Sequence, residues 1–226
     1  SKFITKKDGF NNYQFMPGSG DPGWKLTVPD DKQEEFLTNY YNMKVKPNIS
    51  SNLLEKPHKE YNQIRIDIDL KYMLKDNKSK LSNTHQYKLS TIEKIIKKYI
   101  KFASKYIEIP KKGVNFTVFE KPKSIIKGGI EEKAQFIKDG LHVLCPDLVI
   151  NNTILHVIYN DIINSKKVNE IVKEFDSNEE INKIIDKTVI STNCWFLLGS
   201  GKPSDDNNGY YKLTKNYLVK IDDNDK

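Results

Sequence analysis

Two aspartates two positions apart on a predicted strand are the residues best placed for chemistry. Apolar and polar residues alternate strictly in the segment Ile64–Leu70, with Arg65, Asp67 and Asp69 on the polar side. This period of two predicts a half-buried strand, on which the two carboxylates lie roughly 6.5–7 Å apart on one face. Such like charges repel, and a divalent cation with hard oxygen ligands relieves the repulsion. A solvated strand face is the alternative that this segment leaves open.

A second candidate is the segment Lys138–His142. We expect a loop that ends at Gly140, followed by a short strand that directs His142 away from Leu141. Lys138 supplies a cation and Gly140 lets the backbone approach closely, so the segment could bind an anion. A hydrogen-bonded structural histidine is the plainer interpretation.

A glycine-rich turn with a lysine follows an apolar segment near the C-terminus, at Gly199–Pro203. It is not a P-loop, because Phe196 and Pro203 stand where that motif needs a glycine and a serine or threonine. Lys202 could still bind phosphate as a point charge. An ordinary hairpin turn with an exposed lysine is the alternative.

One further acidic residue, Asp186, interrupts the apolar segment Ile184–Ile190. It could cap a helix, lie at the surface, or act as a third metal ligand.

Predicted strands and helices are interleaved along the chain. We expect strands at 24–28, 64–70, 114–119, 141–145, 195–198 and 210–219, and helices at 30–41, 90–106, 148–163 and 168–175. Ser90 and Glu93 form a predicted capping box, Pro146 should stop a strand, and Asp147 should cap the helix after it. Interleaved helices and strands predict an α+β or α/β fold with a mixed sheet.

Composition gives broader limits. The chain has 226 residues, 11% aromatic residues and a net charge of +7, which suits a packed domain with a polyanionic partner. Cys145 and Cys194 lack CxxC spacing, so we expect neither a zinc site nor a disulfide framework, and a reducing compartment. No apolar segment approaches the length of a membrane span. Because the first residue is Ser1, we expect a domain of a longer polypeptide.

The order of these motifs resembles the archaeo-eukaryotic primase (primase–polymerase) superfamily. The segments 138–143, 186–190 and 195–203 are most similar to the N-terminal primase domains of primase–helicases from large cytoplasmic DNA viruses of the poxvirus, asfarvirus and giant-virus type. The resemblance implies an α+β catalytic core with an RRM-like mixed sheet flanked by helices, plus an N-terminal α/β lobe. It covers residues 24–220, with 1–23 as a flexible segment and 221–226 as a frayed tail or linker to a helicase part.

The same resemblance implies roles for individual residues. Asp67, Asp69 and Asp186 would bind two Mg²⁺ or Mn²⁺ ions. The implied ligands of the nucleotide phosphates are Lys138, Gly140, His142, Ser200 and Lys202, and the implied nucleotide or template contacts are Arg65 and Asn193. The chain departs from the pattern at Gly140, where many relatives have serine, and at Cys194 and Leu197, where cellular relatives have arginine.

The function that the resemblance implies is primer synthesis on single-stranded DNA in viral replication, by two-metal nucleotidyl transfer. The expected partners are template and primer DNA, nucleoside triphosphates and a C-terminal helicase domain, with no membrane, in the host cytoplasm or a viral factory. A non-catalytic DNA-binding module and a metal-dependent nuclease are the alternatives. The paired histidines of nicking enzymes are absent, because His58, His85, His142 and His156 form no HxH motif.

Overall fold

The computed structural model describes residues 12–16, 23–49, 51–74, 84–127, 135–177, 179–202 and 209–221. Most of the segment 1–23 that was predicted to be flexible, Pro203, and residues 222–226 of the predicted tail lie outside these ranges.

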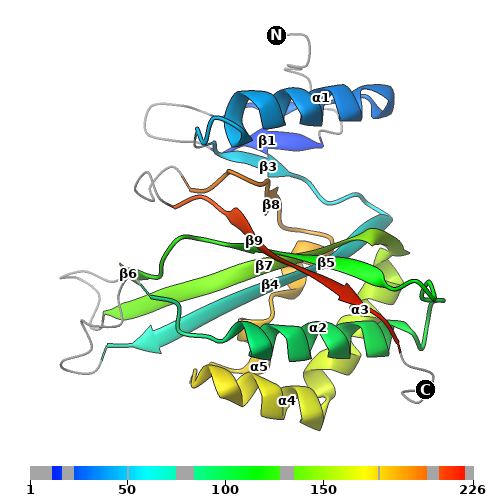
Figure 1. Ribbon diagram of the computed structural model, residues 1–226, viewed down its shortest axis with the longest axis vertical. Helices are drawn as coiled ribbons and strands as arrows, with labels where there is room; N and C mark the ends of the chain where they lie inside the picture. The colour runs from blue at the N-terminus through cyan, green and yellow to red at the C-terminus, as the bar shows by residue number, and fades with distance from the viewer. Residues whose placement is uncertain are drawn as a thin grey trace.

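A five-stranded antiparallel sheet forms the centre of the protein (Figure 1). Its order is β4-β7-β5-β9, and β6 pairs with the first three residues of β7. The strands are β4 (Tyr61–Met73), β5 (Val114–Glu120), β6 (Ile125–Lys127), β7 (Phe136–Asn151) and β9 (Lys212–Val219). Strand β7 lies between β4 and β5. Apart from the short β6, the chain order β4-α2-β5-β7-α3 follows the strand, helix, strand, strand, helix order of an RRM-like core.

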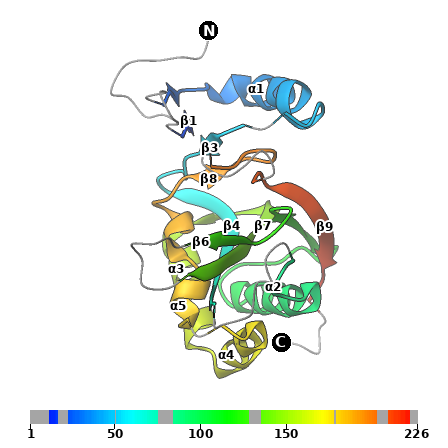
Figure 2. The same cartoon turned by 90° about the vertical axis from the view of Figure 1, so that its left-hand side faces the viewer.

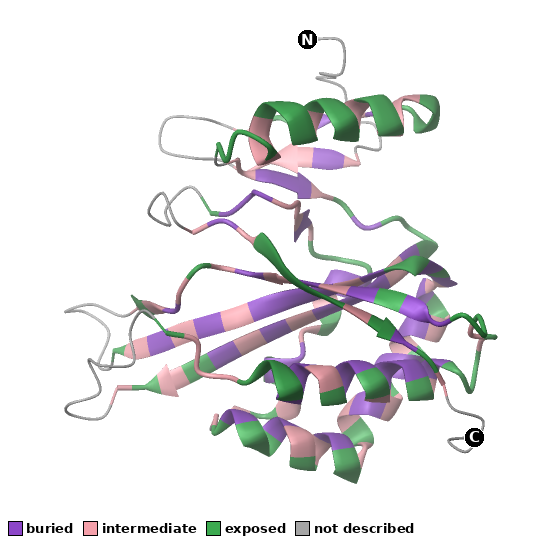
Figure 3. Cartoon of the chain, in the orientation of Figure 1, coloured by how far each residue is buried: buried purple, intermediate pink, exposed green. Residues whose placement is uncertain are grey.

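Helices cover one face of this sheet, below it in Figure 1. They are α2 (Leu89–Ala103), α3 (Asn152–Asn164), α4 (Lys166–Val172), which runs into η4 (Lys173–Phe175), and the single turn α5 (Ile181–Ile184). The apolar side of β4 packs against them, and its residues Ile64–Leu70 alternate between buried isoleucine or leucine and polar side chains. Figure 3 shows the buried surfaces of α2 and the sheet turned toward each other. Each buried isoleucine contributes roughly 1.5–3 kcal/mol, so the alternation fixes which face carries the aspartates.

A smaller four-stranded sheet lies on the opposite side of the large sheet from α2 (Figures 1 and 2). Its order is β2-β1-β3-β8, and the strands are β1 (Tyr13–Phe15), β2 (Lys25–Leu26), β3 (Leu53–Glu55) and β8 (Trp195–Phe196). The outer helical segment consists of η1 (Asp30–Lys32), α1 (Gln33–Tyr40) and the π-helical η2 (Tyr41–Val45). Its side chains pack on Tyr13 and Leu53.

The structure corrects several predicted boundaries. Tyr13–Phe15, which were predicted to be flexible, form β1 because the Tyr13 ring is buried in the small-sheet core. Pro146 does not stop β7. It lies in a β-bulge opposite Gln63 and Ile64, and the strand continues to Asn151. The Asn151 side chain, rather than Asp147, accepts the capping hydrogen bond of α3.

The remaining differences concern helix ends and strand pairing. Lys88 precedes α2 without a side-chain cap, so the capping box at Ser90 does not form, and α2 ends at Ala103 before Tyr106. The α+β class is confirmed, but the named strands all pair antiparallel, where a mixed sheet was expected. Strands β8 and β9 belong to different sheets, so the segment between them crosses from one sheet to the other. Within the described ranges, no helix has the length and apolar character needed to cross a membrane.

Candidate active site

The polar face of the large sheet and the edge of the small sheet enclose a cavity of about 460 Å³, which we call the carboxylate cavity. Its lining includes most of the predicted site residues: Asp67, Asp69, Lys138, His142, Asp186, Asn193 and Lys202. Strand β8 contributes Trp195 and Phe196 from the small sheet. Residues from distant parts of the chain therefore meet in one place.

Strand pairing positions the first group of side chains. Asp67 on β4 lies opposite His142 on β7, and Asp69 lies opposite Gly140. Because facing residues of an antiparallel pair project to the same side, His142 is directed to the polar face, away from Leu141, as predicted. The Lys138 ammonium lies 3.0 Å from the Asp69 carboxylate, so a cation already sits at one end of the aspartate pair.

Asp186 reaches the same face through the main chain. Ile185 forms an isolated antiparallel bridge with Ile68, and the Asp186 N–H donates to the Asp67 carbonyl oxygen at 3.0 Å. The Asp186 carboxylate also caps the 3-10 helix η5 (Lys187–Ile190), because it accepts from the Thr188 N–H at 2.8 Å and the Thr188 hydroxyl at 2.6 Å. The predicted helix cap and the third carboxylate of the site are therefore the same residue.

The electrostatics of this group favour a bound cation. Burial and the nearby charges of Asp69 and Asp186 raise the pKa of Asp67 well above its usual range, and Lys138 and Lys121 only partly offset the effect. Three carboxylates with hard oxygen donors and uncompensated repulsion fit Mg²⁺ or Mn²⁺. No set of three acidic, histidine or cysteine side chains in the described ranges is already spaced as a metal cage. In this geometry the Asp69 carboxylate is paired with Lys138.

His142 is held between two aromatic rings. Its ring centroid lies 3.8 Å from that of Tyr211 and 4.0 Å from that of Trp195, and 5% of the residue is exposed. Burial, with the charges of Lys121 and Arg65, lowers the pKa of His142 to about 3, so the ring is neutral at pH 7. Its Nε2 lies 3.6 Å from the Asp67 carboxylate, and its buried Nδ1 has no hydrogen-bond partner in the described part of the chain. The imidazole can therefore act as a hydrogen-bonding group but not as a cation.

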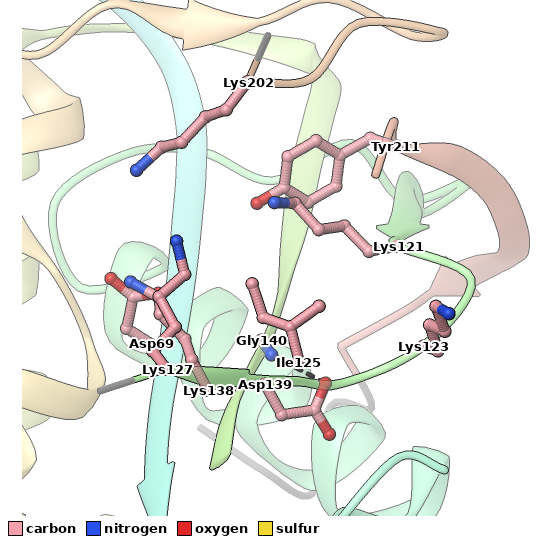
Figure 4. A pocket seen from close by; sticks show the side chains of 10 residues that line it. All are labelled: Asp69, Lys121, Lys123, Ile125, Lys127, Lys138, Asp139, Gly140, Lys202 and Tyr211. Atoms are coloured by element: carbon pink, nitrogen blue, oxygen red, sulfur yellow. Dashed lines mark hydrogen bonds and ion pairs between the residues drawn. The ribbon is translucent and has the colours of Figure 1, made fainter. Parts of the chain in front are cut away.

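Five lysines surround a pocket that adjoins the carboxylate cavity (Figure 4). This lysine pocket shares Asp69, Lys121, Lys138, Lys202 and Tyr211 with the cavity and adds Lys123 and Lys127. Lys202 and Lys121 extend into it from one side, while Asp69 and Lys138 lie on the other. A cluster of ammonium groups beside carboxylates suits a polyphosphate whose other oxygens bind a metal.

Sequence reasoning did not identify Lys121, Trp195 or Tyr211 as site residues. Lys121 directly follows β5, and only the pairing of β5 with β7 brings it beside His142. The single sequence signal was the density of lysines after residue 120, which reads equally well as a solvated loop. Tyr211 lies across the gap in the described residues from Lys202, just before β9.

Gly140 has a structural reason to be glycine. A Cβ atom at this position would lie 2.3 Å from the Ile68 carbonyl oxygen of the neighbouring strand. The Gly140 N–H also donates to the Asp139 carboxylate at 2.8 Å. The backbone of Gly140 therefore lies close to the neighbouring strand β4. A contact of Gly140 with phosphate stays a prediction.

Two predicted site residues, Arg65 and Ser200, line neither the carboxylate cavity nor the lysine pocket. Arg65 is buried and forms an ion pair with Glu55, and its guanidinium lies 5.8 Å from the Trp195 ring centroid. Ser200 is fully buried, with its hydroxyl 2.7 Å from the Tyr40 hydroxyl. In this geometry the polar groups of Arg65 and Ser200 are directed to Glu55 and Tyr40, and the predicted contacts of both residues with the nucleotide or template stay predictions.

A family model described as the C962R protein N-terminal AEP domain, where AEP denotes archaeo-eukaryotic primase, matches residues 18–217. The matched range includes all the lining residues of the carboxylate cavity except Gln14 and Met16. No curated protein matches the chain.

Proposed function

The chain belongs to the AEP family of the C962R N-terminal domain, as its motif order indicated, and we propose that it is a primase/polymerase that joins nucleotides on single-stranded DNA during viral replication. The family is of the primase/polymerase nucleotidyltransferase type. The observation that carries the proposal is the meeting of Asp67, Asp69 and Asp186 beside a lysine-lined pocket. The proposed catalytic domain spans residues 24–220.

Asp67, Asp69 and Asp186 would hold the divalent cations. Bound Mg²⁺ or Mn²⁺ would activate the 3′-hydroxyl of the primer and stabilise charge on the leaving pyrophosphate. The protein's contribution is to fix these carboxylates on paired backbone segments, since β4 and the start of η5 are joined by a main-chain hydrogen bond. Preorganised charge of this kind costs little reorganisation during the reaction.

The lysines orient the nucleotide. Lys138, Lys121 and Lys202 would neutralise the triphosphate, and their origin in three different elements constrains its direction. When phosphate displaces the Lys138–Asp69 contact, one ammonium moves to the nucleotide and one carboxylate becomes available to the metal. The neutral His142 would offer a single hydrogen bond, held in orientation by the Trp195 and Tyr211 rings.

Nucleotide incorporation on a primed single-stranded template tests this proposal. With Mg²⁺ or Mn²⁺ we expect extension by the native chain and a loss of at least a thousandfold in Asp69→Asn. The matched control is Asp161→Asn, which removes a carboxylate on α3 that pairs with Lys105 away from the cavity. Extension by Asp69→Asn at the control rate would refute the assignment.

A non-catalytic DNA-binding module is the second candidate. It is favoured by the Lys138–Asp69 ion pair, which satisfies the aspartate without a metal. Under this alternative the native chain binds DNA but incorporates no nucleotide with either metal. A nuclease would instead degrade labelled DNA with metal and no nucleotides.

A further inference from the structure

A third pocket, of about 340 Å³, lies beside the two already described. Its walls are η2 with the turn that follows it, the segment after β8, and the start of β9. We call it the tyrosine pocket, and its lining is Tyr41, Lys44, Val45, Asn48, Ile49, Leu198, Gly199 and Tyr210–Leu213. Tyr211 lines this pocket, the lysine pocket and the carboxylate cavity, so all three meet at one ring.

The walls of the tyrosine pocket are built from specific contacts. The Tyr210 hydroxyl donates to the Asn48 side-chain oxygen at 3.0 Å. The Tyr40 hydroxyl donates to the Leu198 carbonyl at 2.8 Å, and the Gly199 N–H donates to the Tyr211 carbonyl at 2.9 Å. These bonds tie the outer helical segment to the chain that leads into β9, so the pocket is held in place rather than formed by loose side chains.

The surface of this pocket combines apolar area with positive charge. Tyr41 is 51% exposed, Ile49 49% and Leu213 48%. Lys44 and Lys212 are the charged members of its lining, and no acidic side chain is among the described lining residues. Rings for stacking and ammonium groups for phosphates, side by side, form the usual surface that binds single-stranded nucleic acid.

We propose that the tyrosine pocket binds an unpaired nucleotide of the template strand, with its base stacked on Tyr41 and its phosphates near Lys44 and Lys212. This inference rests on the proposed function and specifies where the template enters. Its position supports it, because Tyr211 lines this pocket and also lines the lysine pocket and the carboxylate cavity. The charge is complementary to a nucleic acid strand.

Stacking is tested with a fluorescent single-stranded oligonucleotide and anisotropy. Loss of one base–aromatic stack costs about 1–3 kcal/mol, so Tyr41→Ala should weaken binding roughly 5- to 150-fold. Tyr41→Phe keeps the ring and should retain native affinity. A 2-aminopurine in the strand should be quenched by the native chain and Tyr41→Phe, and not by Tyr41→Ala. Equal affinity and equal quenching for all three would overturn the inference.

The phosphate contacts are tested by salt dependence. Each contact to a single strand contributes about 0.7 to the slope of log affinity against log salt. The double variant Lys44→Ala, Lys212→Ala should therefore lower the slope by about 1.4. The matched control is Lys98→Ala, Lys101→Ala, in a basic groove on α2 on the far side of the large sheet. A loss of slope in the control and not in the test variant would place the strand on α2 and overturn the inference.

Nucleotide binding separates this inference from the proposed function. Binding of a nucleoside triphosphate with Mn²⁺ in the absence of DNA should be unchanged in Tyr41→Ala. If the native chain binds DNA in a Tyr41-dependent way but neither binds nor incorporates nucleotides, the proposed function fails and this inference stands. If the native chain incorporates nucleotides, and Tyr41→Ala and the double variant Lys44→Ala, Lys212→Ala bind DNA normally, the proposed function stands and this inference fails.

Discussion

The Asp186 N–H donates a hydrogen bond to the Asp67 carbonyl oxygen at 3.0 Å, which joins two distant chain segments beside their own carboxylates. The backbone therefore holds these two residues side by side. The ionised Asp67 carboxylate is electrostatically unfavourable here, because burial and the charges of Asp69 and Asp186 raise its pKa. A carboxylate whose pKa is raised by such neighbours is typical of a functional site.

Asp67→Asn should stabilise the metal-free protein while abolishing nucleotide incorporation. Because folding raises the pKa of Asp67, the ionised form at pH 7 opposes folding, and a neutral amide of the same shape removes that cost. Thermal unfolding at pH 7 should shift upward by a few degrees, at about 2–4 °C per kcal/mol. The difference should shrink as the pH falls through the raised pKa. A lower melting temperature for Asp67→Asn at pH 7 would contradict this reading.

Gly140→Ala should destabilise the fold. Its Cβ would lie 2.3 Å from the Ile68 carbonyl oxygen, so β4 and β7 must separate where Asp67, Asp69 and His142 are held. Forced overpacking typically costs about 1–3 kcal/mol, and urea denaturation measures it. Lys138→Ala, on the same face of the same strand, should change stability by less than about 0.5 kcal/mol. Equal stability for native protein and Gly140→Ala would show that the strands can move apart freely.

Lys121→Ala should raise the KM for the nucleotide by at least about tenfold. An ammonium–phosphate hydrogen bond contributes about 1.5–3 kcal/mol, and Lys121 lines both the lysine pocket and the carboxylate cavity. Steady-state incorporation at varied nucleotide concentration gives the value. Lys111→Ala removes an exposed lysine from a turn and should leave KM unchanged. An unaltered KM in Lys121→Ala would exclude this residue from the triphosphate site.

A histidine–aspartate pair should make stability depend on pH. His85 Nδ1 lies 3.1 Å from the buried Asp139 carboxylate, and this hydrogen bond and the charges of Asp139 and Glu120 raise the pKa of His85. The folded state therefore holds the proton longer than the unfolded state, whose histidine titrates near 6.5. The stabilisation is complete below pH 6.5 and is lost as the pH rises through the raised pKa.

The measurement for this pair is urea denaturation between pH 6 and pH 9. The free energy of unfolding of the native protein, relative to that of His85→Asn, should fall over this range by at most about 1.4 kcal/mol per pH unit. His156→Asn on α3 serves as the control and should keep the native slope. A slope that is the same in His85→Asn and native protein would rule out the pair as its source.

The sequence predicted the structure best where one local pattern decides the orientation of a strand. Alternation in Ile64–Leu70 placed Asp67 and Asp69 on one face, because burying four apolar side chains leaves the strand a single orientation. Pro146 misled because a bulge accommodates it within β7. Lys121 and Tyr211 reach the site only through the pairing of β5 with β7 and β9, and such long-range pairing leaves no local signal.

Diffraction from crystals grown with Mn²⁺ and a non-hydrolysable nucleoside triphosphate would show whether the three aspartates bind metal beside the lysine pocket. We expect an anomalous manganese peak in direct contact with Asp67, Asp69 and Asp186, with the triphosphate between Lys121, Lys138 and Lys202. Lys138 should have left the Asp69 carboxylate. Manganese bound elsewhere, or a triphosphate outside the lysine pocket while Lys138 stays on Asp69, would contradict this expectation.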